Sequence, residues 1–568
     1  MSVVDLQVNR NLLCPNFDGY KLSFDPVPVL RQSLDGFALK RDPHANQYSL
    51  LHTELFAKHN LLFSDPWARH QCYYINVSHE LVLCSYNEAD GQPRPQRTVY
   101  QIPRWDHGDG QNVVGDYNYT LRFVSEKLAV LCDGVLTYML LDTGDRERAA
   151  TWQLLTRSPV TPNGDQRGFV LHDARLDVLQ ERKQISLAAA HIERRREEFV
   201  TQLTWSRWSW QQAGAEAEAG TAASWTYELC QPSLATKGSV YYCAFEPRAQ
   251  SLIVCSNGDL QTPQQHEAAR EAAAAQAAED AVPPYDWQQT PQDLSLRFTL
   301  PADAKRDDLK IESTSTRLLV EYKDQLLLDG ALFAPVDEQL TNWTLEAAGN
   351  ELQLQLQLQL SKTEEKQWPN LLAEQELPAE PLPIPNLEDP IEDCDLPLEA
   401  SDNDIKMVRF NLGHGCITHT IFLGAMPPLF GTTLRPGFPA AFATRHDVDG
   451  AIWLQQFQPS RPDEWNVRHE GQLNAFGYVV ASKEQRKFVD CCPQLDYAVI
   501  CESYRHVFIY KPHNEAAGGL RNRNGPQIVI GKQHLVTLPD DVGEVLGLVT
   551  APKVIIIFTQ HAMLYLQV

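Results

Sequence analysis

The residues best suited to metal chemistry lie in the run His414-Gly-Cys416-Ile-Thr-His419, where one thiol and two imidazoles are potential zinc ligands. A closed structural zinc site takes four ligands, and no second cysteine pair lies nearby to complete it. The run Asp106-His-Gly-Asp109 and its neighbours lack the alternating carboxylates and the terminal glutamate of a calcium loop, so we interpret it as a turn. The sequence therefore predicts no metal and no cofactor.

Motifs for covalent or phosphate chemistry are missing from the sequence. It contains no G-x-S-x-G, no H-E-x-x-H, no phosphate-binding loop and no G-x-G-x-x-G. We therefore expect a protein that is not an enzyme. A hydrolase whose site is assembled from distant residues is the alternative, because such a site leaves no local motif.

Charge and composition narrow the classes of partner. The 568 residues carry a net charge of −24, from 49 basic and 73 acidic side chains, so phosphate backbones and anionic membranes repel the chain. The start of the sequence shows no secretory signal, and the apolar run 554–558 is far shorter than the ~20 residues of a membrane span. The 12 cysteines include no C-x-x-C pair and lie mostly in apolar runs. We expect a reduced protein of the cytoplasm and nucleus, with no membrane contact and no direct contact with nucleic acid.

Short strands and turn residues fill both ends of the sequence. Apolar runs on either side of Asp133-Gly134 predict a hairpin, because this pair accepts positive φ. Further along, we expect four consecutive strands at 476–480, 487–491, 497–501 and 506–510, which is the pattern of a propeller blade. The chain ends on an apolar strand that needs a neighbour, and a strand near Val3–Val8 would close a ring with it.

These patterns predict an all-β chain in which both flanks build one β-propeller and a small sandwich is inserted between them. At ~40–50 residues per blade, the flanks are long enough for about seven blades. Two unrelated β domains are the alternative. The predicted segments are the N-terminal part of the propeller at 1–260, a helical arm at 261–284, the sandwich at 285–370, an acidic proline-rich linker at 371–404 and the C-terminal part of the propeller at 405–568.

The helical arm, a loop within the N-terminal flank and the acidic linker are assigned from local composition. Thr262 and Gln265 form a capping box at the start of the alanine-rich arm. A loop is predicted at Gln211–Ser224, which is rich in Ala, Gly and Glu. Residues 374–404 hold 11 acidic side chains and no Lys or Arg, and their prolines and mutual repulsion keep the linker extended.

The central segment shows the period-two alternation of half-buried strands. Leucines and Phe298 alternate with polar residues over 293–301, and five leucines alternate with glutamines over 352–360. About seven short antiparallel strands fit into the segment, which predicts a small β-sandwich.

Specific residues give this segment a family resemblance. The motifs are Tyr285-x-Trp287-x-Gln289-Thr, Leu300-Pro301, Leu328-x-Gly330-x-Leu332, Val336 with Trp343-Thr-Leu-Glu346, and the closing Lys362…Trp368. Together they resemble the CS domain of the NudC family. The resemblance implies a co-chaperone module without an active site, which binds partners through a sheet face and in several relatives contacts heat-shock protein 90. The sequence departs from the family at Pro369, where typical NudC proteins carry a second tryptophan after Trp368.

Candidate residues follow from the resemblance and from charge. Gly330 and Trp343 are expected to be structural, with Trp343 in the core. Trp287 is expected just outside the first strand, against the sheet edge or a partner. Lys305, Arg306 and Lys310 are expected to form a basic patch in a domain that is otherwise acidic, with a solvated loop as the alternative. The candidate protein-binding residues are Trp287, Gln289, Lys305, Arg306, Lys310 and Trp368.

The sequence therefore predicts a non-catalytic adaptor or scaffold of the co-chaperone type. Its CS domain would contact a chaperone of the heat-shock protein 90 type, and its propeller would bind an unidentified client protein. The alternative from another class is a propeller hydrolase with a regulatory CS domain, which a cluster of carboxylates or histidines in the central channel would favour.

Overall fold

Two compact units make up the computed structural model, one of Met1–Glu267 with Leu398–Val568 and one of Ala268–Pro397. The structure describes residues 2–568 except 104–115, 149–150, 160–168, 180–181, 196–197, 212–223, 263–264, 266–267, 269–284, 302–303, 324, 348–352, 374–404 and 513–527. The predicted loop at 211–224, the helical arm and the acidic linker therefore lie largely outside the described residues. The start of the arm is described, and there Thr262 and Gln265 form the predicted capping box.

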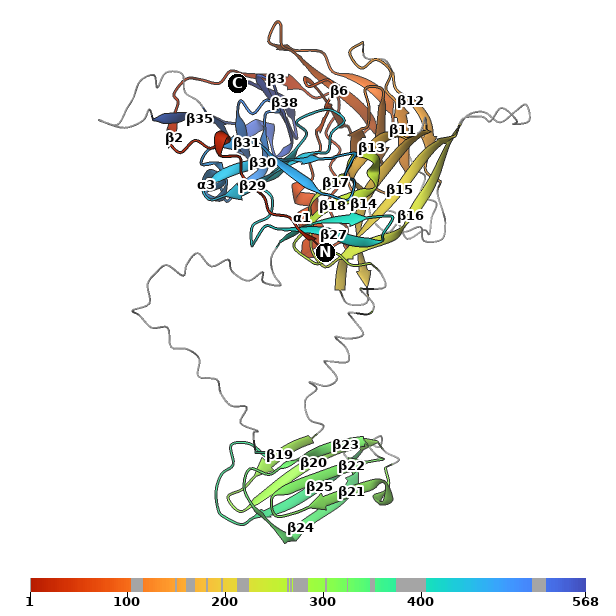
Figure 1. Ribbon diagram of the computed structural model, residues 1–568, viewed down its shortest axis with the longest axis vertical. Coiled ribbons are helices and arrows are strands. Elements are labelled where there is room, and N and C mark those ends of the chain that lie inside the picture. The colour runs from red at the N-terminus through yellow and green to blue at the C-terminus, as the bar shows by residue number, and fades with distance from the viewer. Residues whose placement is uncertain are drawn as a thin grey trace, which may run out of the picture. The chain divides into compact units, whose positions relative to one another are not determined.

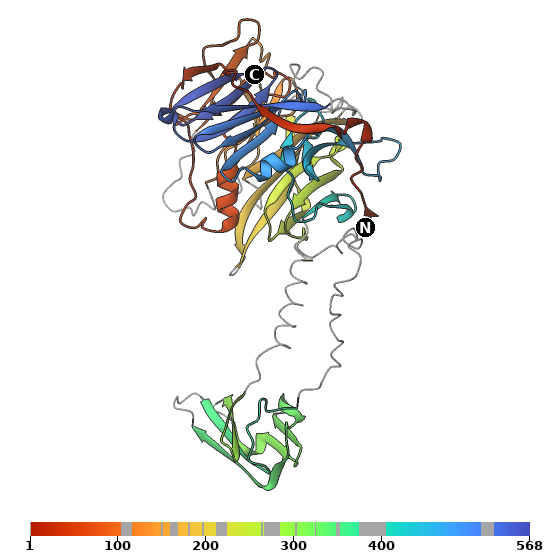
Figure 2. The same ribbon diagram turned by 90° about the vertical axis from the view of Figure 1, so that its left-hand side faces the viewer.

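The described strands of the first unit form seven sheets, each mostly continuous in sequence (Figures 1 and 2). Blades 1 to 3 contain β4 (Phe63–Ser64), β5 (Gln71–Ile75), β6 (Glu80–Asn87), β7 (Gln92–Pro93) and β8 (Arg97–Gln101); β9 (Thr120–Phe123), β10 (Leu128–Cys132), β11 (Tyr138–Asp142) and β12 (Gln153–Arg157); and β13 (Val170–Leu179), β14 (Arg182–Arg195), β15 (Glu198–Gln211) and β16 (Ser224–Thr236).

Blades 4, 6 and 7 combine strands from both flanks, and blade 5 is built from the C-terminal flank alone. They contain β17 (Val240–Phe245), β18 (Ser251–Ser256), β26 (Lys406–Asn411), β27 (Cys416–Phe422) and β1 (Ser2–Val3); β28 (Phe430–Thr432), β29 (Ala441–His446), β30 (Asp449–Gln456) and β31 (Asn466–Leu473); β32 (Arg486–Cys491), β33 (Ala498–Glu502), β34 (His506–Lys511), β35 (Val529–Thr537) and β2 (Phe17–Leu22); and β36 (Val545–Ala551), β37 (Val554–Thr559), β38 (Ala562–Gln567) and β3 (Val29–Ser33).

The apolar core of this unit lies between the blades. Among the described residues, each of its seven buried clusters joins two neighbouring blades. The cluster that joins blade 7 to blade 1 packs Tyr74 and Cys84 against Ile556 and Tyr565. The blades therefore form a closed ring, and the predicted propeller of about seven blades built from both flanks is confirmed.

Ring closure uses a different strand from the one predicted. In blade 7, β3 pairs antiparallel with β38, with Val29 opposite Leu566 and Ser33 opposite Ala562. The predicted region near Val3–Val8 instead contributes β1 to the outer edge of blade 4, parallel to β27. The prediction of closure near Val3–Val8 is therefore wrong, because several N-terminal strands suit an open edge and the sequence does not show which one reaches it.

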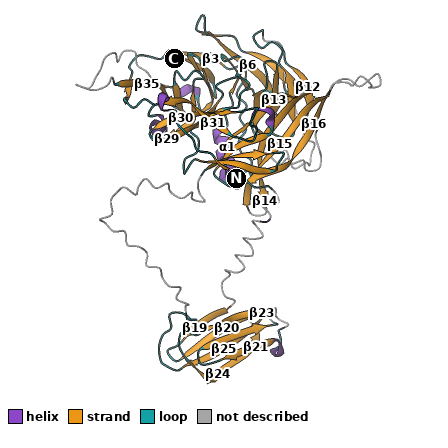
Figure 3. Cartoon of the chain, viewed as in Figure 1, coloured by secondary structure: helices purple, strands orange, loops and turns teal. Residues whose placement is uncertain are grey.

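Helices are few among the described residues (Figure 3). The predicted strand at 476–480 is wrong, since these residues form the helix α3 (Phe476–Ala481). Phe476 and Val480 are buried at i, i+4 while Tyr478 is exposed, and a short apolar run does not distinguish a helix from a strand. The other α-helix in the described part of the chain is α1 (Leu50–Lys58), and the 3-10 turns described there are η1 (Arg10–Leu12), η2 (Pro247–Ala249), η3 (Arg306–Asp308) and η6 (Asp540–Val542).

Turn chemistry positions the hairpin of β10 and β11 as predicted. Gly134 has φ +76°, and the Asp133 carboxylate accepts hydrogen bonds from the backbone N–H groups of Val135 and Thr137 at 2.8 and 3.0 Å. The strands then pair from Cys132 with Tyr138 to Leu128 with Asp142.

The second unit contains the predicted antiparallel sandwich. One sheet has the order β19 (Tyr285–Gln289), β20 (Asp293–Pro301), β25 (Gln353–Lys362), β24 (Val336–Ala347), and the other is β21 (Leu309–Ser313), β22 (Arg317–Tyr322), β23 (Gln325–Ala331). Leu356, Leu358 and Leu360 are fully buried between the sheets, whereas Gln359 is exposed. The Leu/Gln alternation therefore builds the core of this unit.

The closing segment of the sandwich extends three residues beyond the predicted end at 370, and Leu371 and Leu372 belong to its core. Leu371 is 3% exposed, its carbonyl accepts a hydrogen bond from the Phe333 N–H, and the Ala373 N–H donates to the Ala331 carbonyl at 2.8 Å. A Cβ on Gly330 would lie 2.8 Å from the Leu372 side chain. Gly330 is thus required by the close approach of this closing segment.

Candidate functional site

The sandwich is inserted at a hairpin of the propeller. Strands β18 and β26 are direct neighbours in blade 4, with Ser256 opposite Lys406 and Ser251 opposite Asn411. The chain between Ser256 and Lys406 therefore takes the place of a simple turn. Because the two strands pair without a break, the blade is complete on either side of the insertion.

Two predicted binding residues of the sandwich are bound to each other. The Gln289 side-chain amide donates to the Trp368 carbonyl at 2.7 Å, and its oxygen accepts from the Trp368 N–H at 2.8 Å. Lys362 donates to the same Gln289 oxygen at 2.8 Å. Trp368 is 3% exposed, so this group closes the core. Neither residue presents its side chain for docking without local opening of the domain.

The other two tryptophans lie at the rim of the core. Trp287 is within β19, an edge strand, and not just outside the first strand as predicted. Its ring is half-buried against the core, as is that of Trp343 in β24. Both are therefore partly structural and partly accessible.

The predicted basic patch is divided by its contacts. The Arg306 guanidinium lies 4.6 Å from the centre of the Trp343 ring, which is cation–π distance. Lys310 lies 3.4 Å from Glu312 and 3.5 Å from Glu321, so its charge is offset locally. Lys305 is exposed at the start of η3. Lys305 and Arg306 with Trp343 therefore form the more available cationic surface.

The first strands of the seven blades surround a central channel of the propeller. Its cavity is about 940 Å³, and α1 and the segment 433–440 also contribute to its wall or mouths. At one mouth, Lys58 of α1 lies over the Tyr241 ring at the start of β17. At the other, Arg69 donates to the carbonyls of Thr433 and Leu434 at 2.8 and 3.0 Å. Each mouth is thus partly covered.

Ionisable groups in this channel were not predicted from sequence. Burial raises the pKa of the Asp490 carboxyl to about 6, against the effect of hydrogen bonds from Thr550 and the Cys491 N–H, each at 2.8 Å. The Asp173 carboxylate accepts from the Phe245 and Ala174 N–H groups at 2.8 and 2.9 Å, and burial raises its pKa too. Asp490 joins blade 6 to blade 7 and Asp173 joins blade 3 to blade 4. Other charged residues lie in the same two strands, so the sequence carries no signal that singles out these two carboxylates.

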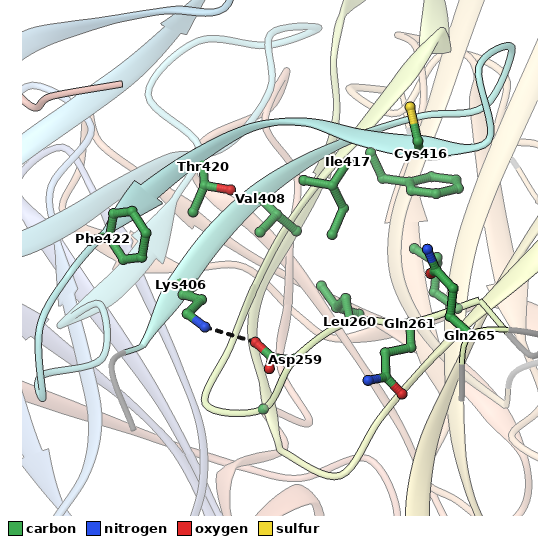
Figure 4. A pocket seen from close by; sticks show the side chains of 13 residues that line it. Asp259, Leu260, Gln261, Gln265, Lys406, Val408, Cys416, Ile417, Thr420 and Phe422 are labelled. Atoms are coloured by element: carbon green, nitrogen blue, oxygen red, sulfur yellow. Dashed lines mark hydrogen bonds and ion pairs between the residues drawn. The ribbon is translucent and has the colours of Figure 1, made fainter. Parts of the chain in front are cut away.

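A second hollow lies on blade 4 beside the root of the insertion (Figure 4). Its volume is about 540 Å³, and its wall is mostly apolar, with Val408, Ile417 and Phe422 from β26 and β27 and with Leu260 from the loop after β18. Lys406 forms an ion pair with Asp259 at 2.9 Å within this wall. Its chemistry suits apolar side chains of a peptide more than a polar small molecule.

Comparison with known proteins assigns the sandwich. Residues 283–357 match the CS domain family. These residues form a CS domain. The chain is also 26% identical to NudC domain-containing protein 1 of Mus musculus, covering 94% of this chain and 93% of that one, and 26% identical to the Xenopus laevis protein of that name, covering 99% and 98%. The resemblance to the NudC family, and to this member in layout, is therefore confirmed.

Solved structures of low sequence identity are also similar to this chain. The nuclear movement protein from E. cuniculi GB-M1 is 20% identical, covering 16% of this chain and 99% of that chain with a TM-score of 0.14. The Chaetomium thermophilum Sqt1 bound to the N-terminus of the ribosomal protein L10 is 11% identical, covering 90% and 97% with a TM-score of 0.32.

The described part of the chain shows neither a metal-binding cluster nor a membrane-spanning helix. No cluster of three or more His, Cys, Asp or Glu side chains there is arranged to hold a metal ion, and the run that contains Cys416 is part of the hollow on blade 4. None of the helices described there is long and apolar enough to cross a membrane.

Proposed function

We propose that this chain is a non-catalytic adaptor, in which the CS domain contacts a chaperone of the heat-shock protein 90 type and the propeller binds a client protein. The observation that carries the proposal is the insertion of a complete CS domain at a hairpin of a complete propeller. Each part has its own closed core. Two binding surfaces on one chain are what an adaptor requires.

The CS domain offers a cationic surface suited to an acidic chaperone. Arg306 is held over Trp343, and Lys305 lies one residue away with an exposed side chain. In a chain of net charge −24, this local positive surface would steer the domain toward an acidic partner. Charge at the rim of an interface acts mainly on the association rate and on salt dependence.

Charge reversal of this surface tests the chaperone contact. We expect Lys305→Glu with Arg306→Glu to weaken heat-shock protein 90 binding about tenfold or more at low salt, with a smaller difference at 0.5 M salt because exposed charges are screened. Lys366→Glu is the matched control, since it is exposed in the same domain and makes the same type of charge change. Isothermal calorimetry measures the affinity, and thermal unfolding confirms that each variant is folded.

Removal of the insertion tests the division of the two surfaces. Deletion of 259–405 joins Ser256 to Lys406 through Asn257-Gly258, a pair that forms tight hairpin turns. Quantitative proteomics of captured proteins should then show loss of the chaperone and retention of the clients. Loss of both together, or of neither, would contradict the two-surface proposal.

The ionisable groups of the channel favour the second candidate, a propeller hydrolase. Asp490 is the strongest candidate for the general acid of such a hydrolase, because a carboxyl with a pKa of about 6 suits proton transfer near neutral pH. Its contacts with Thr550 and Cys491 instead fit a brace between blades. Hydrolysis of ester or peptide probes that Asp490→Asn abolishes would favour the enzyme.

The proposal places the protein in the cytoplasm and nucleus, with protein partners and without direct contact to nucleic acid or membrane. The cysteines of the described residues are free thiols, mostly buried, which suits a reduced compartment. Fluorescence imaging of the tagged chain with fractionation checks this placement.

A further inference from the structure

An arginine of the central channel has no acidic partner at contact distance. Arg122 lies in β9, where its Nε donates to the His172 carbonyl at 3.0 Å and its Nη1 donates to the Leu121 carbonyl at 3.2 Å. No salt bridge to it is formed among the described residues. The nearest attractive charge is that of Asp173, whose carboxylate is already bound to the backbone amides of Phe245 and Ala174.

Two histidines face the same part of the channel. His59 follows α1 and hydrogen-bonds through Nε2 to the Tyr119 carbonyl at 3.0 Å, which leaves its Nδ1 available. The imidazole of His172, in β13, forms no hydrogen bond or ion pair with the described residues. Burial lowers the pKa of both imidazoles to about 4, and the positive charge of Arg122 contributes to this lowering. Arg122 is therefore the principal positive charge at this point of the wall.

We infer that Arg122, His59 and His172 form a binding site for a phosphate group inside the propeller channel. The three side chains come from three elements and line one cavity of about 940 Å³, which exceeds the size of a phosphate ion and admits a small organic phosphate. A buried guanidinium without an ion-pair partner is costly, and a bound anion removes that cost. A tetrahedral oxyanion offers more acceptor oxygens to donors from three segments of the chain than the two oxygens of a carboxylate.

This phosphate site is separate from the surfaces proposed to bind the chaperone and the client. A phosphate held between β9, β13 and the residue after α1 would cross-link blades 2 and 3 to the helix that covers one mouth. Such a ligand would stabilise the native ring by mass action, because it binds the folded and not the unfolded chain.

The test is titration of the full chain with inorganic phosphate and, separately, with ribose 5-phosphate, at ionic strength held constant with chloride. We expect a saturable rise of the thermal midpoint of the propeller and broadening of the 31P resonance. Arg122→Gln should reduce phosphate affinity at least tenfold. His59→Gln should reduce it less, since glutamine retains a donor for the Tyr119 carbonyl.

Two further variants keep the outcome decisive. His172→Gln removes an imidazole that forms no hydrogen bond or ion pair with the described residues, so it should weaken binding while the ring stays folded. Arg468→Gln, on the outer strand β31, is the matched control and should bind as the parent does. Stronger binding of ribose 5-phosphate than of phosphate identifies an organic ester as the ligand, and equal binding identifies the free ion. No saturable response of the parent chain, or equal responses of the parent and Arg122→Gln, would overturn the inference.

Discussion

At the scale of single residues, this propeller keeps charges inside the ring by giving them backbone partners. Arg69 binds two carbonyls, and Asp173 binds two amides. Such bonds compensate part of the desolvation cost of a buried charge and at the same time join blades that pack through apolar side chains. The polar atoms of the channel are therefore a second set of connections around the ring.

Asp490 should be destabilising at neutral pH. Its folded-state pKa of about 6 is above its usual value of 3.8, so the folded state binds more protons than the unfolded state between these values. Stability is therefore lost as the pH rises from about 4 to 6. We expect Asp490→Asn to increase the free energy of unfolding by roughly 1–3 kcal/mol at pH 7, and to have little effect near pH 4.

Chemical denaturation at several pH values measures this change. The neutral amide still accepts from the Cys491 N–H, and Thr550 keeps its own bond to the Cys491 carbonyl at 2.9 Å. A loss of stability at pH 7 that is larger than any loss at pH 4 would contradict this prediction and show that the ionised carboxylate is required.

At the scale of elements, β3 has the role that completes the ring. It supplies the fourth strand of blade 7, and Leu30 packs on the cluster between blades 7 and 1. By contrast, β1 and β2 add outer strands, parallel to their neighbours, to blades that already have four strands. Loss of β3 leaves β38 with an open edge.

Two N-terminal truncations separate these roles. Deletion of 1–34 should lower stability by about 2–4 kcal/mol, since it removes the apolar contacts of Leu30 and Leu34 as well as the strand pairing. Deletion of 1–24 should cost less and leave the β38 amides protected. Hydrogen exchange of Ala562–Gln567 measures the difference, and equal protection in both truncations would refute the role of β3.

At the scale of the whole molecule, the two units should unfold independently. We expect calorimetry of the full chain to show two transitions, one matching the fragment 283–373 and one close to that of the chain lacking 259–405. The chain lacking 259–405 should unfold at a slightly lower temperature than the propeller of the full chain, because the deletion removes the buried side chains of Leu260 and Ile405. A transition that is present only in the full chain would show that the units stabilise each other.

The fragment boundary is part of this prediction. A CS fragment that ends at 370 loses Leu371 and Leu372, which cover the core next to Gly330. It should therefore unfold at a lower temperature than 283–373. If the two fragments melt alike, the closing segment does not contribute to the core.

Local pattern in the sequence was sufficient for much of the fold. Period-two alternation marked the buried leucines of β25, and Asp133-Gly134 marked a hairpin, because strand faces and tight turns depend on neighbouring residues. The closing motif of the CS domain identified Trp368, and composition separated the sandwich from its flanks. Each of these features is written within a few residues of the chain.

Contacts between distant segments were decided only by the tertiary structure. Which N-terminal strand closes the ring depends on competition among edges, so β3 could not be distinguished from Val3–Val8. The helix α3 replaced a predicted strand because it packs on the start of β30, where Gly477 approaches the Asp449 carbonyl too closely for a side chain. His59, Arg122 and His172 line one channel only because blades 2 and 3 and the end of α1 surround it. The sequence by itself therefore determined the elements and the CS domain, whereas packing around the ring determined which charges share its interior.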